Sequence, residues 1–318
     1  MGEFELIRRY FLPLGERQES RSLILGLGDD CAIQRIPAGR DLVFSVDALV
    51  EGVHFPRNYR PDYLGWRALA VAASDLAAMG ADPECFTLAL TLPVVDEQWL
   101  KDFSKGLKAA SDAFGLELAG GDTTSGPLAL SLQVHGSLEQ GAGVRRSGAR
   151  PGDLIAVSGT LGDAGAALGY LTESAPSADM VAVLERYHHP RPRLDLAQSV
   201  RQYASAAIDI SDGLLADLGH ILAASGVGAR IDSARLPLSP ALMRLKGVDA
   251  VNYALRSGDD YELCLCFSPA NWERAPESLK SQLTVIGSVE VEPRLYLDGV
   301  DCSVEAVPAG FDHFRSES

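Results

Sequence analysis

The sequence lacks the features that would place the protein in a membrane or on a nucleic acid. No apolar run is long enough to cross a bilayer, and no basic segment followed by an apolar segment opens the chain. Lysine and arginine number only 28 against 43 aspartates and glutamates, which leaves a formal net charge of −15. Nucleic acids and anionic lipid surfaces attract basic side chains, so this charge disfavours both partners. We therefore expect a soluble cytoplasmic protein.

Cysteines and the familiar phosphate-binding motifs are also scarce. The five cysteines are odd in number, irregularly spaced and form no CxxC pair, which favours buried, reduced thiols over disulfides or a zinc site. No GxxxxGKS/T motif occurs, no GxGxxG joins a strand to a helix, and the protein-kinase motifs are missing. A nucleotide site in this chain would have to be built in another way.

The chain instead contains interleaved strand and helix patterns, which predict an α/β (α+β) fold. Its 318 residues suggest two domains, and a Gly-rich stretch at 138–150 places the boundary so that they span 1–140 and 141–318. The expected helices span residues 2–12, 63–79, 97–114, 164–171, 179–187, 195–203 and 214–224. The expected strands span residues 42–46, 116–121, 128–134, 154–158, 206–210, 263–267 and 283–289, with another at 86–92 and a hairpin near 298–299.

Acidic residues recur where apolar runs end. Asp47 follows the run 42–46, Asp122 follows 116–121, and Asp29 and Asp30 follow 23–28. One interpretation is that each acid merely ends a strand or caps a helix. A cation site shared by all of them explains the whole set.

The segment from Asp209 to Asp212 combines two acids with Ser211 at the corner between the strand 206–210 and the helix 214–224. Backbone N–H groups point outward at such a corner, so it commonly binds a ligand, although Asp212 could simply cap the helix. Carboxylates in this corner would repel a phosphate unless a cation stood between them.

Asp75 lies inside the helix 63–79, among alanines and leucines on nearly every face. It either faces solvent or is buried, and a buried carboxylate needs a cation or strong hydrogen-bond donors. We favour the cation.

Oxygen ligands without nearby histidines or cysteines favour Mg²⁺ over zinc or copper, and no EF-hand spacing is present. Because Mg²⁺ keeps several waters and also binds substrate phosphates, the acids predict a nucleotide-phosphate site bridged by more than one metal. Arg145 and Arg146 are the basic candidates for phosphate, although they could equally be solvated loop charges.

Taken together, these motifs resemble the thiamine-monophosphate kinase family of the aminoimidazole-ribonucleotide-synthetase-like superfamily. The resemblance covers nearly the whole chain, in order. It is carried by the segments 28–30, 47–55, 74–81, 120–123, 146–153, 209–214, 258–263 and 310–314.

The resemblance implies a PurM-like fold, with an N-terminal dimerising domain and a C-terminal α/β domain that completes the nucleotide and substrate site. It implies ATP-dependent phosphorylation of thiamine monophosphate to thiamine diphosphate by direct transfer, with several Mg²⁺ ions and without a phosphoenzyme. It also implies a cytoplasmic homodimer.

The resemblance further implies residue roles. No residue acts as an acid or base, and Arg146 stabilises the transfer together with the metals. Nucleotide contacts are implied for Gly121, Asp122, Arg146 and Ser211, and thiamine monophosphate contacts for His54, Asp260 and Phe311. The implied metal ligands are Asp30, Ser45, Asp47, Asp75, Asp122, Asp209 and Asp212.

The sequence departs from the family pattern in two places. Val46 follows Ser45, so a metal contact at Val46 must come from the backbone, and Ser104 follows Phe103, so no adenine-stacking residue is evident. Two alternatives remain: an ATP-dependent synthetase of the same superfamily that activates an amide or selenide, and a non-catalytic module that binds Mg²⁺ or nucleotide.

Overall fold

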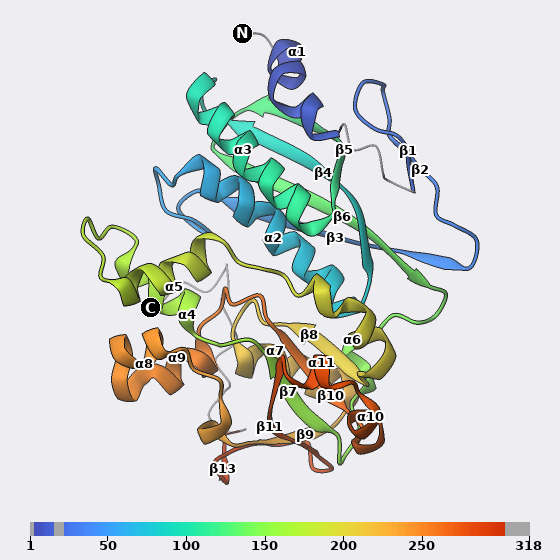
Figure 1. Ribbon diagram of the computed structural model, residues 1–318, viewed down its shortest axis with the longest axis vertical. Coiled ribbons are helices and arrows are strands. Elements are labelled where there is room, and N and C mark those ends of the chain that lie inside the picture. Colours follow the sequence, from blue (N-terminus) through green and yellow to red (C-terminus); the bar gives the residue numbers. More distant parts are fainter. Residues whose placement is uncertain (1–2, 16–21, 303–318) are drawn as a thin grey trace. The chain divides into compact units, whose positions relative to one another are not determined.

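The structure is a computed structural model that describes residues 3–15 and 22–302, and it divides the chain into two compact units. The first unit comprises Met1–Leu76 and Ala81–Gly143, and the second comprises Ala77–Gly80 and Val144–Ser318. Within the described residues, no helix is long and apolar enough to cross a bilayer. Figure 1 shows the helices and strands of each unit.

The first unit is built on a four-stranded sheet with the order β3-β6-β4-β5. Only β4 and β5 run parallel; the other two neighbouring pairs are antiparallel. Short helical turns, α1, η1 and η2, and the small β1–β2 ladder precede the sheet. The bounds are α1 Glu3–Leu6, η1 Ile7–Phe11, η2 Leu12–Gly15, β1 Leu23–Leu25, β2 Ile33–Gln34, β3 Arg40–Val50, α2 Pro61–Met79, β4 Asp82–Leu92, α3 Glu97–Phe114, β5 Glu117–Ser125 and β6 Ala129–Glu139.

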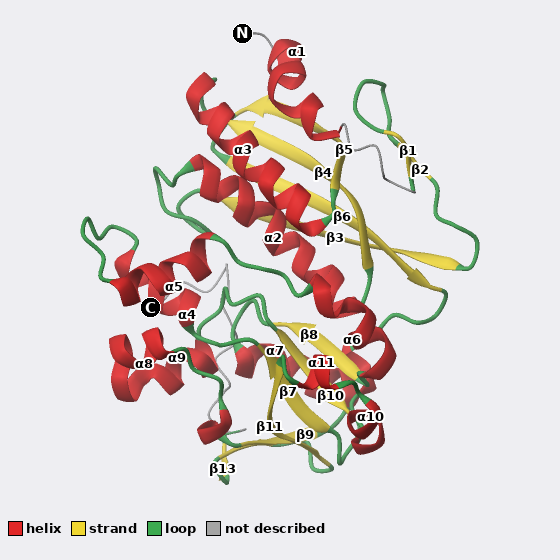
Figure 2. Ribbon diagram, viewed as in Figure 1, coloured by secondary structure: helices red, strands yellow, loops and turns green. Residues whose placement is uncertain are grey.

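Helices α2 and α3 cover one face of this sheet (Figure 2). They approach so closely that a Cβ atom on Gly65 would overlap the carbonyl oxygen of Phe103, and one on Gly106 would overlap that of Asp62. Glycine permits this contact because it has no side chain to separate the two backbones. The contact fixes where α2 lies, and α2 carries Asp75.

The second unit contains a seven-stranded sheet with the order β13-β12-β9-β11-β7-β10-β8, antiparallel except between β12 and β9. Its strands are β7 Leu154–Ser158, β8 Ala206–Asp209, β9 Gly228–Ile231, β10 Leu263–Phe267, β11 Leu283–Glu290, β12 Leu295–Leu297 and β13 Val300–Asp301. Its helices are η3 Arg146–Gly148, α4 Asp163–Ala167, η4 Leu168–Tyr170, α5 Ala178–His188, η5 Leu194–Leu196, α6 Ala197–Tyr203, α7 Leu214–Ser225, η6 Ser233–Arg235, α8 Pro240–Lys246, η7 Gly247–Asp249, α9 Ala250–Arg256, α10 Pro269–Arg274 and α11 Glu277–Lys280.

Both faces of the β7-β10-β8 part of this sheet are buried. Cys264 and Cys266 join a core cluster on one face, and Leu265 and Phe267 join a different cluster on the other. Because successive side chains of a strand point to opposite faces, β10 is apolar at every position. The prediction of buried thiols is confirmed for Cys85, Cys264 and Cys266; it is wrong for Cys31, which is exposed, and for Cys302, which is half-buried.

Most expected elements are confirmed with small shifts, including the strand Leu263–Phe267 and the turn at Asp298-Gly299 between β12 and β13. Three expectations are wrong in extent. Residues 3–15 form three short helical pieces instead of one helix, α4 stops at Ala167, and β3 and β5 run on through Asp47 and Asp122. These two acids do not end their strands, since cross-strand hydrogen bonding continues past them.

The glycine contact between α2 and α3 predicts a large cost for one added methyl group. Gly106→Ala should lower the free energy of unfolding by about 2 kcal/mol or more, because the methyl group meets backbone that cannot rotate away. The matched control is Gly219→Ala in α7, where a Cβ meets nothing within 4 Å; it should raise stability by about 0.5–1 kcal/mol. Urea unfolding of both variants measures the difference. Equal stabilities would show that the helices do not pack on these glycines.

Candidate active site

Three of the expected metal ligands meet in the first unit. Ser45 and Asp47 are two residues apart on β3 and therefore point to the same face of the sheet. Helix α2 brings Asp75 to this face, where the Ser45 hydroxyl donates a hydrogen bond to Asp75 Oδ2. Burial, with a further contribution from the charge of Asp75, raises the pKa of Asp47 to about 6. Two carboxylates and a hydroxyl thus share one partly buried place.

This cluster has the donor chemistry that Mg²⁺ prefers, since all three groups offer oxygen. Among residues 3–15 and 22–302, no three acid, histidine or cysteine side chains already lie close enough to hold a metal by themselves. Two carboxylates nevertheless suit Mg²⁺, which completes its shell with waters and substrate phosphates. The raised pKa of Asp47 is the observation that fits a cation, because a positive charge would offset both the cost of burying the Asp47 charge and its repulsion from Asp75.

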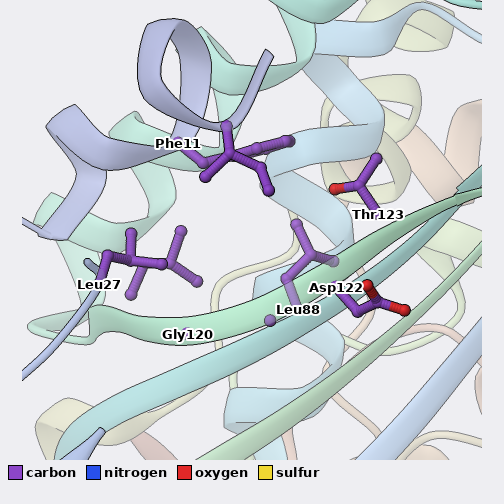
Figure 3. A pocket seen from close by; sticks show the side chains of 9 residues that line it. Phe11, Leu27, Leu88, Gly120, Asp122 and Thr123 are labelled. Atoms are coloured by element: carbon purple, nitrogen blue, oxygen red, sulfur yellow. The ribbon is translucent and has the colours of Figure 1, made fainter. Parts of the chain in front are cut away.

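Gly121 and Asp122 lie on β5 and border a pocket whose walls are mostly apolar. In Figure 3, Phe11 and Leu88 point toward one another, and Asp122 and Thr123 lie at the end opposite Leu27. A side chain at position 121 would overlap the Leu88 carbonyl oxygen, so glycine is required there. The full lining is Ile7, Phe11, Leu27, Leu88, Leu118, Gly120, Gly121, Asp122 and Thr123.

The sequence did not predict this apolar lining, because the helix pattern at 2–12 gave no sign that Ile7 and Phe11 border a pocket. The pocket combines a narrow apolar space with one carboxylate at its edge.

Asp30 and His54 occupy loops of the first unit. Asp30 is exposed between β1 and β2, and its N–H donates to Asp29 Oδ1 at 2.8 Å. His54 follows β3, and its Nδ1 accepts the N–H of Val50 at 3.0 Å. This bond places the proton of a neutral His54 ring on Nε2.

In the second unit, Asp209 is the last residue of β8 and is almost completely buried. The N–H groups of Ser211, Asp212 and Gly213 follow it, and all three donate to Asp217 Oδ2. Arg146 lies in η3 with an exposed side chain, and its carbonyl oxygen accepts from Ser225 Oγ of α7 at 2.9 Å. The exposed guanidinium is compatible both with a phosphate contact and with a solvated loop charge.

Asp260, a predicted substrate contact, is buried inside the second unit. It is only 3% exposed, and its Oδ2 accepts the N–H of Gly162 at 2.7 Å. Its Oδ1 has no hydrogen-bond partner in the described part of the chain. Burial raises the pKa of Asp260 well above its usual range, and Asp163 and Glu262 add to this effect. Its role as a substrate contact stays a prediction, and Phe311 lies outside the described residues.

A second buried carboxylate, Glu262, was missed by sequence reasoning although it lies in the same motif as Asp260. Ser158 Oγ donates to it at 2.6 Å, Arg186 at 2.6 Å and Arg193 at 3.1 Å. Glu262 is therefore fully paired inside the unit. The strained backbone beside it, with φ of 70° at Asp259 and 50° at Tyr261, fixes how Asp260 and Glu262 point inward.

The raised pKa of Asp47 predicts a pH effect on the metal-free protein. Because the folded state favours protonated Asp47, this group's stabilising contribution is fully present below about pH 4 and is lost as pH rises through about 6. Asp47→Asn cannot lose a proton, so its melting temperature should exceed that of the wild type by an amount that grows from pH 4 to pH 7.5.

Thermal melts in a chelator measure this difference, and Asp249→Asn at an exposed position serves as the control. Parallel curves for the wild type and Asp47→Asn would show that burial and Asp75 do not perturb Asp47.

Comparisons with known proteins agree over the whole chain. The family model described as AIR synthase related protein, N-terminal domain, matches residues 28–138, and its C-terminal counterpart matches residues 150–300. Thiamine-monophosphate kinases of Salmonella typhimurium and Escherichia coli K12 are each 44% identical, over 99% of this chain and 99% of theirs.

Solved structures give the same result. The thiamine-monophosphate kinase of Stenotrophomonas maltophilia K279a has a TM-score of 0.85 at 43% identity, covering 94% of this chain and 97% of that one. AaThiL complexed with AMPPCP and TMP has a TM-score of 0.80 at 34% identity, covering 88% and 89%. The expected PurM-like fold is confirmed by these matches. The chain belongs to the thiamine-monophosphate kinase family, within the AIR synthase related proteins.

Proposed function

We propose that this protein phosphorylates thiamine monophosphate to thiamine diphosphate with ATP, in the cytoplasm, by direct phosphoryl transfer. The observation that carries the proposal is 44% identity over 99% of the chain to proteins named thiamine-monophosphate kinase. The similar AaThiL structure holds AMPPCP and TMP, an ATP analogue and the proposed substrate. The oxygen ligands of the first unit support the same conclusion from the residues themselves.

We propose that Mg²⁺ ions bind at Ser45, Asp47 and Asp75 in the first unit. The remaining proposed ligands are Asp30, Asp122, Asp209 and Asp212. When bound, Mg²⁺ neutralises the charge of two phosphorylated molecules that would otherwise repel each other. The chain's part is to hold the carboxylates in fixed positions, which β3 and α2 do for Asp47 and Asp75.

Other residues would place the two substrates. Gly121, Asp122, Arg146 and Ser211 are proposed to contact the nucleotide, and the pocket that Gly121 and Asp122 border supports a ligand at this part of β5. His54, Asp260 and Phe311 are proposed to contact thiamine monophosphate.

No acid or base is needed, because the accepting phosphate is already ionised and transfer depends on positioning and electrostatics. In this scheme residues 1–140 bind metal and pair with a second copy, and residues 141–318 complete the site.

An ADP-release assay with and without thiamine monophosphate tests the proposal and separates it from its alternatives. ADP should form only when thiamine monophosphate, ATP and Mg²⁺ are all present. Asp212→Asn should lower turnover by about 100-fold or more while leaving the fold intact, because a neutral amide is a poor Mg²⁺ ligand. Asp249→Asn should retain wild-type turnover.

Two results of this assay would count against the kinase. The first is equal ADP release with and without thiamine monophosphate. The second is a complete lack of ADP release in both cases.

We propose that the protein is a homodimer that pairs through β3. The face of β3 opposite Ser45 and Asp47 carries Leu42, Phe44 and Val46, which are 42%, 61% and 58% exposed. On β6, the half-buried His135 and Gln133 face Phe44 and Val46, and the rings of Phe44 and His135 lie 6.2 Å apart. An exposed apolar stripe of this kind marks a contact surface, and a second copy supplies a matching stripe by symmetry.

A charge in this stripe should separate the two copies. Phe44→Asp should raise the dimer dissociation constant by about 100-fold or more, because the carboxylate would be desolvated in the interface. Val248→Asp, at a residue that is 96% exposed, should leave the dimer intact. Sedimentation equilibrium measures both. The same mass for wild type and Phe44→Asp at every concentration would place the interface elsewhere.

A further inference from the structure

The corner between β8 and α7 contains three consecutive N–H groups that converge on one oxygen atom. Ser211, Asp212 and Gly213 donate to Asp217 Oδ2 at 3.0, 3.0 and 3.1 Å. Convergent N–H groups of this kind form a nest that binds an anion such as phosphate. Asp217 is the fourth residue of α7 and only 2% exposed, so the chain itself supplies the acceptor oxygen for these N–H groups.

The same loop is held from its other side by the segment 256–259. The N–H of Asp259 donates to the carbonyl oxygen of Ser211 at 2.9 Å. Gly213 has φ of 113°, and a Cβ there would lie 2.7 Å from the carbonyl oxygen of Arg256. The backbone at 211–213 is therefore restrained both by hydrogen bonds to Asp217 and by contacts with the segment 256–259.

We propose that Asp217 is a positioning residue for the reaction, because its carboxylate fills the nest and fixes the backbone that carries Ser211 and Asp212. The nest is thereby closed to phosphate. The corner then presents side-chain oxygens to a cation, instead of presenting N–H groups to an anion. The link to metal binding rests on the proposed function, whereas the restraint on the loop does not.

Two substitutions separate the position of this oxygen from its charge. Asp217→Asn keeps an acceptor oxygen at the same distance from the main chain but removes the charge. Asp217→Glu keeps the charge but adds a methylene group, which moves the oxygen away from the three N–H groups in a buried space. Asp249→Asn, at an exposed acid of the same unit, is the matched control.

The first measurement is hydrogen exchange at amides 211–213 in the whole, ligand-free protein. We expect Asp217→Asn and the control to exchange within about threefold of the wild type, and Asp217→Glu to exchange about tenfold faster or more, since the shared acceptor is displaced. Melting temperatures establish that each variant is folded. A folded Asp217→Asn that exchanges as fast as Asp217→Glu overturns the proposal, and so does a folded Asp217→Glu that exchanges like the wild type.

The second measurement is the Mg²⁺ concentration that half-saturates binding of a non-hydrolysable ATP analogue, measured by calorimetry. We expect Asp217→Glu to need about tenfold more Mg²⁺ and Asp217→Asn to stay within about threefold of the wild type. If exchange changes as expected but the Mg²⁺ requirement does not, Asp217 restrains the loop but is not a positioning residue for the reaction. If neither the wild type nor any variant binds the analogue, the proposed function fails while the exchange result on the loop stands.

Discussion

The burial of Asp47 beside the like charge of Asp75 is the constraint on which the site in the first unit depends. A β-strand and a helix bring the two carboxylates to one partly buried place, and burial together with this repulsion raises the pKa of Asp47 to about 6. The close glycine contact between α2 and α3 helps to fix α2 and therefore Asp75. A fold that holds like charges together at a cost to its own stability gains from a divalent cation, which turns the repulsion into attraction.

Three buried acids of the second unit have hydrogen-bond partners of a different kind. Glu262 receives two arginines and a hydroxyl, Asp163 receives hydroxyls from Thr160 and Ser239, and Asp217 receives three backbone N–H groups. These carboxylates have their hydrogen-bonding capacity met inside the second unit, as buried polar groups require. The contrast distinguishes acids that shape the unit from acids suited to binding a cation.

The residues alone predicted the α/β class, most helices and strands, and a cation site shared by Asp47 and other acids, whereas Ser45 was implied only by the family resemblance. The sequence could predict this much because buried strands and helices have strong apolar periodicity, and because an acid among apolar residues needs a partner. It could not predict that β3 and β5 continue past Asp47 and Asp122, because strand ends depend on the neighbouring strands. Nor could it predict that Asp217 fills the β8–α7 corner, since that contact depends on a side chain folding back over one helical turn.

The most direct test of the central claim is anomalous diffraction from crystals grown with Mn²⁺, as a substitute for Mg²⁺, and a non-hydrolysable ATP analogue. The account predicts an anomalous peak about 2.0–2.3 Å from oxygens of both Asp47 and Asp75, the range of metal–oxygen bonds for such ions. A well-ordered nucleotide with no peak between these two carboxylates would contradict it.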